Sequence, residues 1–337
     1  MGGFKINFIG NFGTGYVGEV ADETHLARSL EELGNKVQRV PRDIWKAYCD
    51  GEWDNAWKDK LPIEADINIV VKWHHFNKSN YIKILQTKSK APVLYWVWDF
   101  MYDEISKDFI DWHKAIAETA DVLLTNEGGL IPEYKKMGIN AYYFPFDCAD
   151  EQLKCYLGSY KIKPEQYDVV FPGSYLQQGD RVKWLKIINK EAPVRIYSWN
   201  YREWEKEGFR AFPAVYGNDF NKMIAEHKIC LQFSVNDHCW GYWSNRVGKV
   251  LLARGFLLAR YAPGMELFLK DGVEYFHSPE EAIEKIKFYL EPKNDVKRWQ
   301  VRERGAILGR EHFTSKRRCK ELLIFIKNYL YETKGKN

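Results

Sequence analysis

The sequence lacks any apolar run approaching the roughly 20 residues that a membrane-spanning helix needs. Its six cysteines form no C-x-x-C pair and no spacing typical of metal ligands. No short-period repeat, low-complexity tract or signal-peptide pattern is present. These absences argue against membrane-embedded, disulfide-bonded and zinc-stabilised classes of protein. They favour a cytoplasmic protein with reduced thiols.

Length and composition indicate a globular protein of two domains. The chain has 337 residues, of which 45% are hydrophobic and 28% charged. Aromatic residues make up 16% of it, including 13 Trp and 21 Tyr. Most of these rings are expected in the core, and some are expected to stack on sugars or bases.

Charge of one sign is concentrated at the C-terminus. Residues 292–337 hold 13 Lys and Arg against 5 Asp and Glu, a net charge of +8, whereas residues 1–160 carry −6. Such a basic segment is suited to contact nucleic acid or an anionic membrane surface. The alternative is a solvated helix face packed along a domain seam.

Apolar strands alternate with helix-length segments in both halves of the chain, which predicts parallel sheets covered by helices. The strands expected in the first half are 5–9, 36–40, 66–71, 92–98, 121–125 and 140–144. Those of the second half are 167–171, 194–198, 228–233, 255–259 and 273–276. Between them, the pattern lapses from Pro145 to about Pro164, as at a hinge. We predict two Rossmann-like domains facing a cleft, over residues 1–160 and 161–315, with a C-terminal helix over 316–337 returning toward the first.

One glycine motif resembles a dinucleotide fingerprint. Gly13, Gly15 and Gly18 match G-x-G-x-x-G after the first strand. However, acidic residues at the following helix start would repel a pyrophosphate, and the second strand ends without an acid for a ribose hydroxyl. We therefore predict no NAD or FAD, and interpret the motif as a loop that faces the cleft.

Three polar residues follow strands three and four of the first domain. His74 and His75 come after the third strand, and Asp99 ends the fourth. Ligands of α/β sheets bind beyond these strand ends, so each residue is a candidate acid or base. The alternatives are that His75 packs on Trp73 and that Asp99 caps a helix.

The second domain places cations at two expected helix starts. Ser174 ends a strand, and Arg181 and Lys183 open the next helix. Arg246 and Lys249 open another helix, and Glu266 opens the one after it. Cations beside free backbone N–H groups predict a site for a diphosphate. The alternative, ordinary surface cations, suits Lys183 better than Arg246.

Several motifs carry a family resemblance. They are Ser244-Asn-Arg, Gly255-Phe-Leu-Leu, Pro263-Gly-Met-Glu-Leu-Phe, Ser278-Pro-Glu-Glu, Glu311-His-Phe-Thr and Arg317-Arg. Together they resemble the C-terminal domain of group 1, family 4-like glycosyltransferases, in the branch of spore-maturation-type proteins. The resemblance implies the GT-B fold and a sugar nucleotide, UDP- or GDP-linked, held mainly by the second domain. It also implies retention of anomeric configuration, without a metal or other cofactor. The expected acceptor is a hydroxyl of a glycan or small molecule.

One position departs from the family pattern. Lys249 stands where most relatives have a glutamate that grips the ribose of the nucleotide. This departure keeps open a nucleotide-binding or lectin-like module without catalysis. A separate alternative is transfer to a modified base in DNA, as in some phage enzymes, which the basic C-terminal segment favours and the acidic first domain disfavours.

Overall fold

The computed structural model describes residues 3–12, 21–71, 80–98, 102–103, 108–109, 114–146, 165–176 and 180–334. The chain divides into two compact units. The first comprises residues 1–146 and 315–337, and the second residues 147–314. The N-terminal segment of the first unit therefore ends at Phe146, whereas the sequence predicts a boundary at residue 160.

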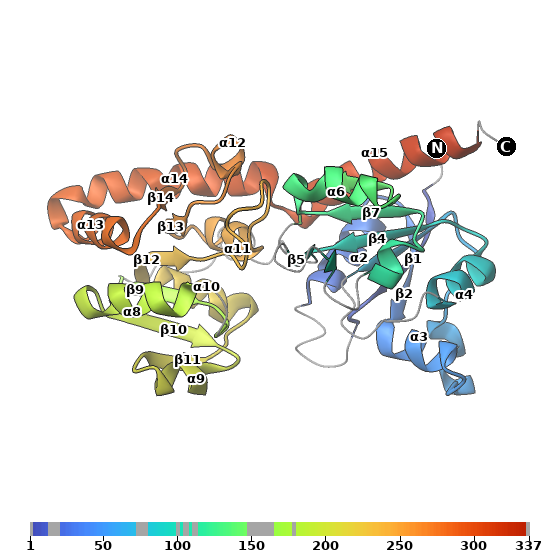
Figure 1. The fold of residues 1–337 in the computed structure, drawn as a ribbon, viewed down its shortest axis with the longest axis horizontal. Helices are drawn as coiled ribbons and strands as arrows, with labels where there is room; N and C mark the ends of the chain where they lie inside the picture. Colours follow the sequence, from blue (N-terminus) through green and yellow to red (C-terminus); the bar gives the residue numbers. More distant parts are fainter. Residues whose placement is uncertain are drawn as a thin grey trace. The chain divides into compact units, whose positions relative to one another are not determined.

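A parallel sheet of six strands forms the centre of the first unit (Figure 1). Its order is β2-β1-β3-β4-β7-β8. The strands are β1 (Lys5–Gly10), β2 (Lys36–Pro41), β3 (Ile67–Val71), β4 (Val93–Val97), β7 (Val122–Thr125) and β8 (Ala141–Tyr143). Two short strands, β5 (Tyr102–Asp103) and β6 (Asp108–Phe109), pair antiparallel apart from this sheet.

Helices of the first unit include one from the far end of the chain. They are α2 (Asp22–Glu32), α3 (Arg42–Cys49), α4 (Asn80–Ser89), α5 (Lys114–Ala117), α6 (Ile131–Lys136) and α15 (Ser315–Lys334). Short 3-10 turns cover Asn55–Lys60 and Gly128–Leu130. Leu322 and Ile326 of α15 are buried in one cluster with Leu26 and Leu30 of α2. The C-terminal helix therefore completes the core of the N-terminal sheet.

The second unit also contains a sheet of six parallel strands, in the order β11-β10-β9-β12-β13-β14. The strands are β9 (Tyr167–Pro172), β10 (Val194–Ser198), β11 (Arg210–Pro213), β12 (His227–Gln232), β13 (Leu257–Arg260) and β14 (Glu274–Phe276). The sheets agree with the predicted pair of Rossmann-like domains, although β11 was not expected. It lies at the edge of the sheet, and its four residues are half-buried or exposed, so it has no apolar run.

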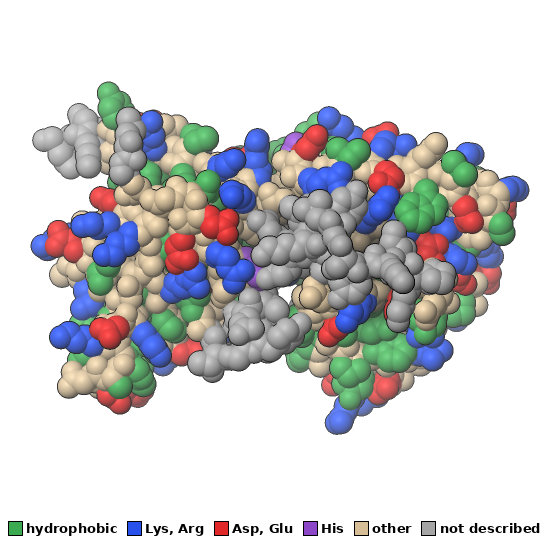
Figure 2. All heavy atoms as spheres, turned by 180° about the vertical axis from the view of Figure 1, so that it is seen from behind, with side chains coloured by type: hydrophobic (Ala, Val, Ile, Leu, Met, Phe, Trp, Pro, Cys, Tyr) green, Lys and Arg blue, Asp and Glu red, His purple; other side chains and the backbone are tan. Residues whose placement is uncertain are grey.

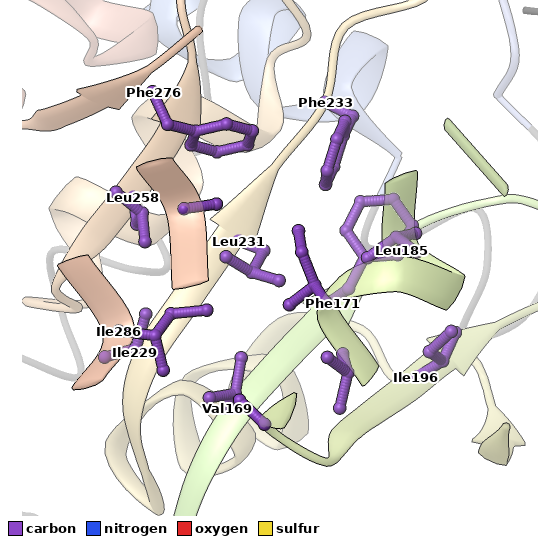
Figure 3. Packing of buried hydrophobic residues seen from close by; sticks show 14 of the residues in the cluster. Val169, Phe171, Leu185, Ile196, Ile229, Leu231, Phe233, Leu258, Phe276 and Ile286 are labelled. Atoms are coloured by element: carbon purple, nitrogen blue, oxygen red, sulfur yellow. The ribbon is translucent and has the colours of Figure 1, made fainter. Parts of the chain in front are cut away.

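Helices cover both faces of the second sheet. They are α8 (Arg181–Glu191), α9 (Tyr201–Lys206), α10 (Gly217–Ala225), α11 (Arg246–Leu252), α12 (Met265–Leu269), α13 (Pro279–Leu290) and α14 (Asp295–His312). A 3-10 turn covers Pro292–Asn294. Phe171 and Leu231 point into one buried cluster with α8 and α13 (Figure 3). Their neighbours Val170 and Cys230 point into another cluster with α10 and α11. This period-2 alternation explains why the strands read as continuous apolar runs.

The predicted capping box at the start of α13 is present. The backbone N–H of Glu281 donates to Ser278 Oγ at 3.1 Å, and Pro279 occupies the first turn. The Glu281 carboxylate accepts from the backbone N–H of His277 at 2.7 Å, one residue before the cap. Among the helices described, none is both long and apolar enough to cross a membrane.

Candidate functional site

The candidate site lies where the strand order of the second sheet reverses. β9 has β10 on one side and β12 on the other, so the chain leaves β9 and β12 toward different neighbours. Such a switch point opens a crevice at the carboxyl ends of the strands, where ligands of this architecture bind. Residues 173–176 follow β9 and residues 233–245 follow β12.

Arg181, the first residue of α8, is 7% exposed and is held by backbone carbonyls. Its guanidinium donates to Ser174 O at 3.2 Å and to Phe233 O at 3.1 Å. Burial, together with the nearby charge of Arg246, lowers the pKa of Arg181 to about 10. Arg181 therefore stays protonated at neutral pH in a site that disfavours its charge.

Arg246 approaches the same place from α11. It is half-buried, and its guanidinium donates to the amide oxygen of Gln232 at 3.0 Å. Burial also lowers the pKa of Arg246 to about 10. The guanidinium carbons of Arg246 and Arg181 lie 5.5 and 5.8 Å from the ring centre of Phe171. The buried ring of Phe171 thus makes cation–π contacts with both guanidinium groups.

A third arginine, Arg260, lies near Arg181 but is paired with carboxylates. Arg260, at the end of β13, forms ion pairs with Asp237 and, at 3.6 Å, with Asp180. Its guanidinium stacks over the ring of Trp184 at 3.9 Å. Its charge also lowers the pKa of Arg181. Arg260 is therefore neutralised by carboxylates, whereas no described carboxylate pairs with Arg181 or Arg246.

Three buried polar atoms at this edge have no hydrogen-bond partner within the described part of the chain. They are Arg181 Nε, Gln232 Nε2 and Ser234 Oγ. An unsatisfied buried polar group costs about 1–3 kcal/mol. Two of these three atoms are donors and the third is a hydroxyl, so the group suits an acceptor-rich ligand.

Ser174 anchors two side chains at once. Its carbonyl accepts from Arg181, and its hydroxyl accepts from Trp199 Nε1 at 2.9 Å. Gly173, the preceding residue, is required by close packing, because a Cβ there would lie 2.3 Å from the Phe171 ring. The loop after β9 therefore packs closely against the Phe171 ring, which also contacts the two arginines.

The two lysines expected at this site are placed differently. Lys183 is exposed and lies two residues after Arg181, so the two side chains leave α8 in different directions. Lys249 is half-buried and lies one turn after Arg246, on the same face of α11. The structure brings Arg181 and Arg246 together and leaves Lys183 on the surface.

Glu266 lies in the first turn of α12, just after the turn that follows β13. Its carboxylate accepts from the Tyr261 hydroxyl at 3.0 Å and from the backbone N–H of Gly264 at 3.1 Å. Gly264 has φ +93°, and a Cβ there would meet the Trp240 ring at 2.8 Å. This turn needs glycine, and it fixes the position of Glu266.

Five of the predicted site residues, Gly13, Gly15, His74, His75 and Asp99, lie outside the described residues. Conversely, sequence reasoning missed Phe171, Gln232 and Arg260. Phe171 and Gln232 read as interior strand positions, and the counter-ions of Arg260 come from distant segments of the chain. The position of Arg260 at the carboxyl end of a strand could have identified it as a candidate site residue.

Comparison with known proteins gives both a family match and a fold match. Residues 181–324 match the family described as glycosyl transferase-like. No curated protein matches the sequence.

Among solved structures, similarity extends over nearly the whole chain at low identity. An alpha-glucosyltransferase in complex with UDP and a 13-mer DNA containing an HMU base has a TM-score of 0.69 at 11% identity, covering 97% of this chain and 100% of that one. The sucrose-phosphate synthase of Thermosynechococcus elongatus has a TM-score of 0.65 at 9% identity, covering 97% and 99%. HepE of Anabaena, in complex with UDP and glucose, has a TM-score of 0.58 at 11% identity, covering 98% and 99%. The fold is that of GT-B proteins.

Proposed function

We propose that this chain, a glycosyltransferase of the GT-B kind, moves a sugar from a nucleoside diphosphate donor to an acceptor hydroxyl. The donor diphosphate binds at the carboxyl edge of the second sheet, against Arg181 and Arg246. Transfer proceeds with retention of anomeric configuration and without a metal, as the group 1 resemblance implies. The spore-maturation-type branch stays a prediction.

One observation carries this proposal: in the described part of the chain, buried Arg181 and half-buried Arg246 have no carboxylate partner. The side-chain and backbone acceptors of Arg181 and Arg246 are neutral oxygens in the described part of the chain. A buried cation is costly unless an anion pairs with it. A diphosphate has two adjacent charged phosphate groups, one for each arginine. The planar guanidinium group of arginine can donate two parallel hydrogen bonds to phosphate oxygens.

The same two arginines would stabilise the departing nucleoside diphosphate. When the bond from the sugar to the diphosphate breaks, negative charge grows on the bridging oxygen. Fixed guanidinium groups stabilise that charge without reorganising, an effect worth about 3–4 kcal/mol for a single donor in comparable sites. Arg260 is the poorer candidate, because Asp237 already neutralises it.

Two further residues orient the donor. Glu266, fixed by Tyr261 and Gly264, accepts from hydroxyls of the sugar. Lys249, on the face of α11 that holds Arg246, adds a third positive charge near the phosphates. Because Lys249 replaces the ribose-binding glutamate of relatives, the nucleoside must be held by other groups.

A base in DNA is the second candidate acceptor. The alpha-glucosyltransferase of similar fold was solved with DNA, and residues 292–337 of this chain carry +8. Exposed Lys316, Arg317, Lys320 and Lys327 line α15. However, Lys and Arg are interspersed with Asp and Glu on the face drawn in Figure 2. DNA binding that weakens steeply with salt would favour this acceptor over a glycan or small molecule.

The test is turnover of UDP-, GDP-, ADP- and TDP-sugars, read as release of the nucleoside diphosphate. We expect release from at least one donor, and a product with the anomeric configuration of that donor by NMR. Release with inversion would overturn the retaining mechanism alone. Tight binding of a donor without any release would instead indicate a binding module.

A further inference from the structure

Trp199, directly after β10, is the most exposed tryptophan of the described residues. Its side chain is 70% exposed, whereas Trp53 and Trp240 are 40% and 39% exposed. Leaving a large aromatic ring in water is unfavourable, since most of its area is apolar. Single exposed aromatic residues are common on protein surfaces, so the contacts and the position of Trp199 decide whether it faces a ligand.

The ring is held in place rather than left mobile. Trp199 Nε1 donates to Ser174 Oγ at 2.9 Å. The next residue, Asn200, accepts from Tyr175 N at 2.9 Å and donates to Tyr175 O at 3.1 Å. The loops after β9 and β10 are thus joined by three hydrogen bonds. The indole N–H is therefore hydrogen-bonded within the protein, while the apolar face of the ring is exposed and can contact a ligand.

The position of Trp199 follows from the topology. In doubly wound sheets the phosphates lie at the end of the first strand, and an acid at the end of the second strand holds the ribose. Here the first strand, β9, leads to Arg181, and the second, β10, ends in Ser198-Trp199-Asn200 without an acid. The nucleoside half of a diphosphate bound at Arg181 would therefore extend over Trp199.

We propose that Trp199 is the stacking platform for the base of the donor nucleotide. This inference rests on the proposed function, because the diphosphate at Arg181 and Arg246 fixes where the base lies. Ser174 links the phosphate-binding Arg181 to the base-binding Trp199, because its carbonyl accepts from Arg181 and its hydroxyl accepts from Trp199. Stacking on an aromatic ring tolerates every base, and it stabilises binding by about 1–3 kcal/mol per base.

The test compares UDP with inorganic pyrophosphate in calorimetric titrations of wild type, Trp199→Ala and Trp199→Phe. GDP and ADP replace UDP if UDP does not bind. We expect Trp199→Ala to weaken nucleotide binding about 5- to 150-fold and to leave pyrophosphate binding unchanged. Trp199→Phe keeps a ring and should recover most of the loss. Trp53→Ala, an exposed tryptophan of the first unit, is the matched control and should change neither affinity.

Three results would overturn the inference. Nucleotide binding by Trp199→Ala within twofold of wild type would show that the ring makes no contact. Equal losses of nucleotide and pyrophosphate would show that Trp199 acts only by holding the Ser174 loop. Failure of wild type to bind any of the three nucleotides would defeat the proposed function itself, and with it this inference.

Discussion

At the scale of single residues, Phe171 organises the site. It is fully buried, yet two guanidinium groups stack on its ring from two different helices. Gly173 allows the loop to pass within contact of that ring. The arginines gain stacking energy that partly offsets their desolvation, but they gain no counter-ion from the described residues. Under the proposed function, the donor diphosphate is the missing counter-ion.

Arg246 is predicted to be essential for turnover. Arg246→Ala should lower kcat/KM about 10²- to 10³-fold, because it removes a fixed positive charge from the leaving group. Arg246→Lys keeps the charge but loses the forked guanidinium donors, so its activity should lie between those of alanine and wild type. Steady-state kinetics with the preferred donor measures both.

The control for this experiment is Lys190→Ala, which removes an exposed cation from the far end of α8. Its kcat/KM should stay within about twofold of wild type, since exposed charges are screened. Equal activity of Arg246→Ala and Lys190→Ala would remove Arg246 from the mechanism.

At the scale of elements, His227 begins β12 as a buried neutral residue. Its Nδ1 lies 2.6 Å from Met223 O, and its ring packs against Tyr167 and Tyr197. Burial, with a contribution from the charge of Arg195, lowers the pKa of His227 from 6.5 to about 4, although the contact with Met223 O raises it. The carboxylate of Asp168 also raises it.

This depressed pKa makes the stability of the second unit depend on pH. Between pH 6.5 and 4 the unfolded chain binds a proton at His227 that the folded chain does not. Stability is therefore full above pH 6.5 and falls as the pH drops, by at most about 3 kcal/mol at pH 4. Urea unfolding of wild type and His227→Gln from pH 4.5 to 7.5 checks this: the variant should show a shallower loss. Parallel pH profiles of the two proteins would contradict it.

Most strands could be predicted from sequence, because parallel strands buried on both faces are continuous apolar runs. K-I-N-F-I and K-I-C-L-Q-F illustrate this, and both form strands close to the predicted bounds. β11 could not be predicted, since an edge strand of Arg-Ala-Phe-Pro has no such run. In the site, helix-start arginines are visible in sequence. The ring beneath them and the counter-ions of Arg260 depend on how distant segments pack.

At the scale of the whole molecule, the two ends of the chain form one unit. α15 follows the last residue of the second unit and packs on α2 with Cys319, Leu322 and Ile326 buried. Its opposite face carries exposed Lys320, Ile324 and Lys327. The α15 part of the basic segment is therefore a structural element whose exposed lysines lie on the solvated side of a core helix. In the α14 part, by contrast, Arg298 and Arg302 are buried.

Leu322→Ala should destabilise the first unit by about 2–5 kcal/mol, because it opens a cavity beneath α15. Ile324→Ala, two residues away on the same helix, removes a side chain that is 61% exposed and should change stability by less than about 0.5 kcal/mol. Thermal or urea unfolding distinguishes them. Similar effects of the two substitutions would show that α15 does not contribute to the core.

The central claim is that a nucleoside diphosphate neutralises Arg181 and Arg246. Isothermal calorimetry with UDP, GDP, ADP and TDP, on wild type and the Arg181→Ala/Arg246→Ala double variant, tests it most directly. Charge-assisted hydrogen bonds contribute about 1.5–3 kcal/mol each, so the double variant should lose about 100-fold or more in affinity for any diphosphate that wild type binds. Unchanged affinity in the double variant, or binding of none of the four nucleotides by wild type, would contradict the account.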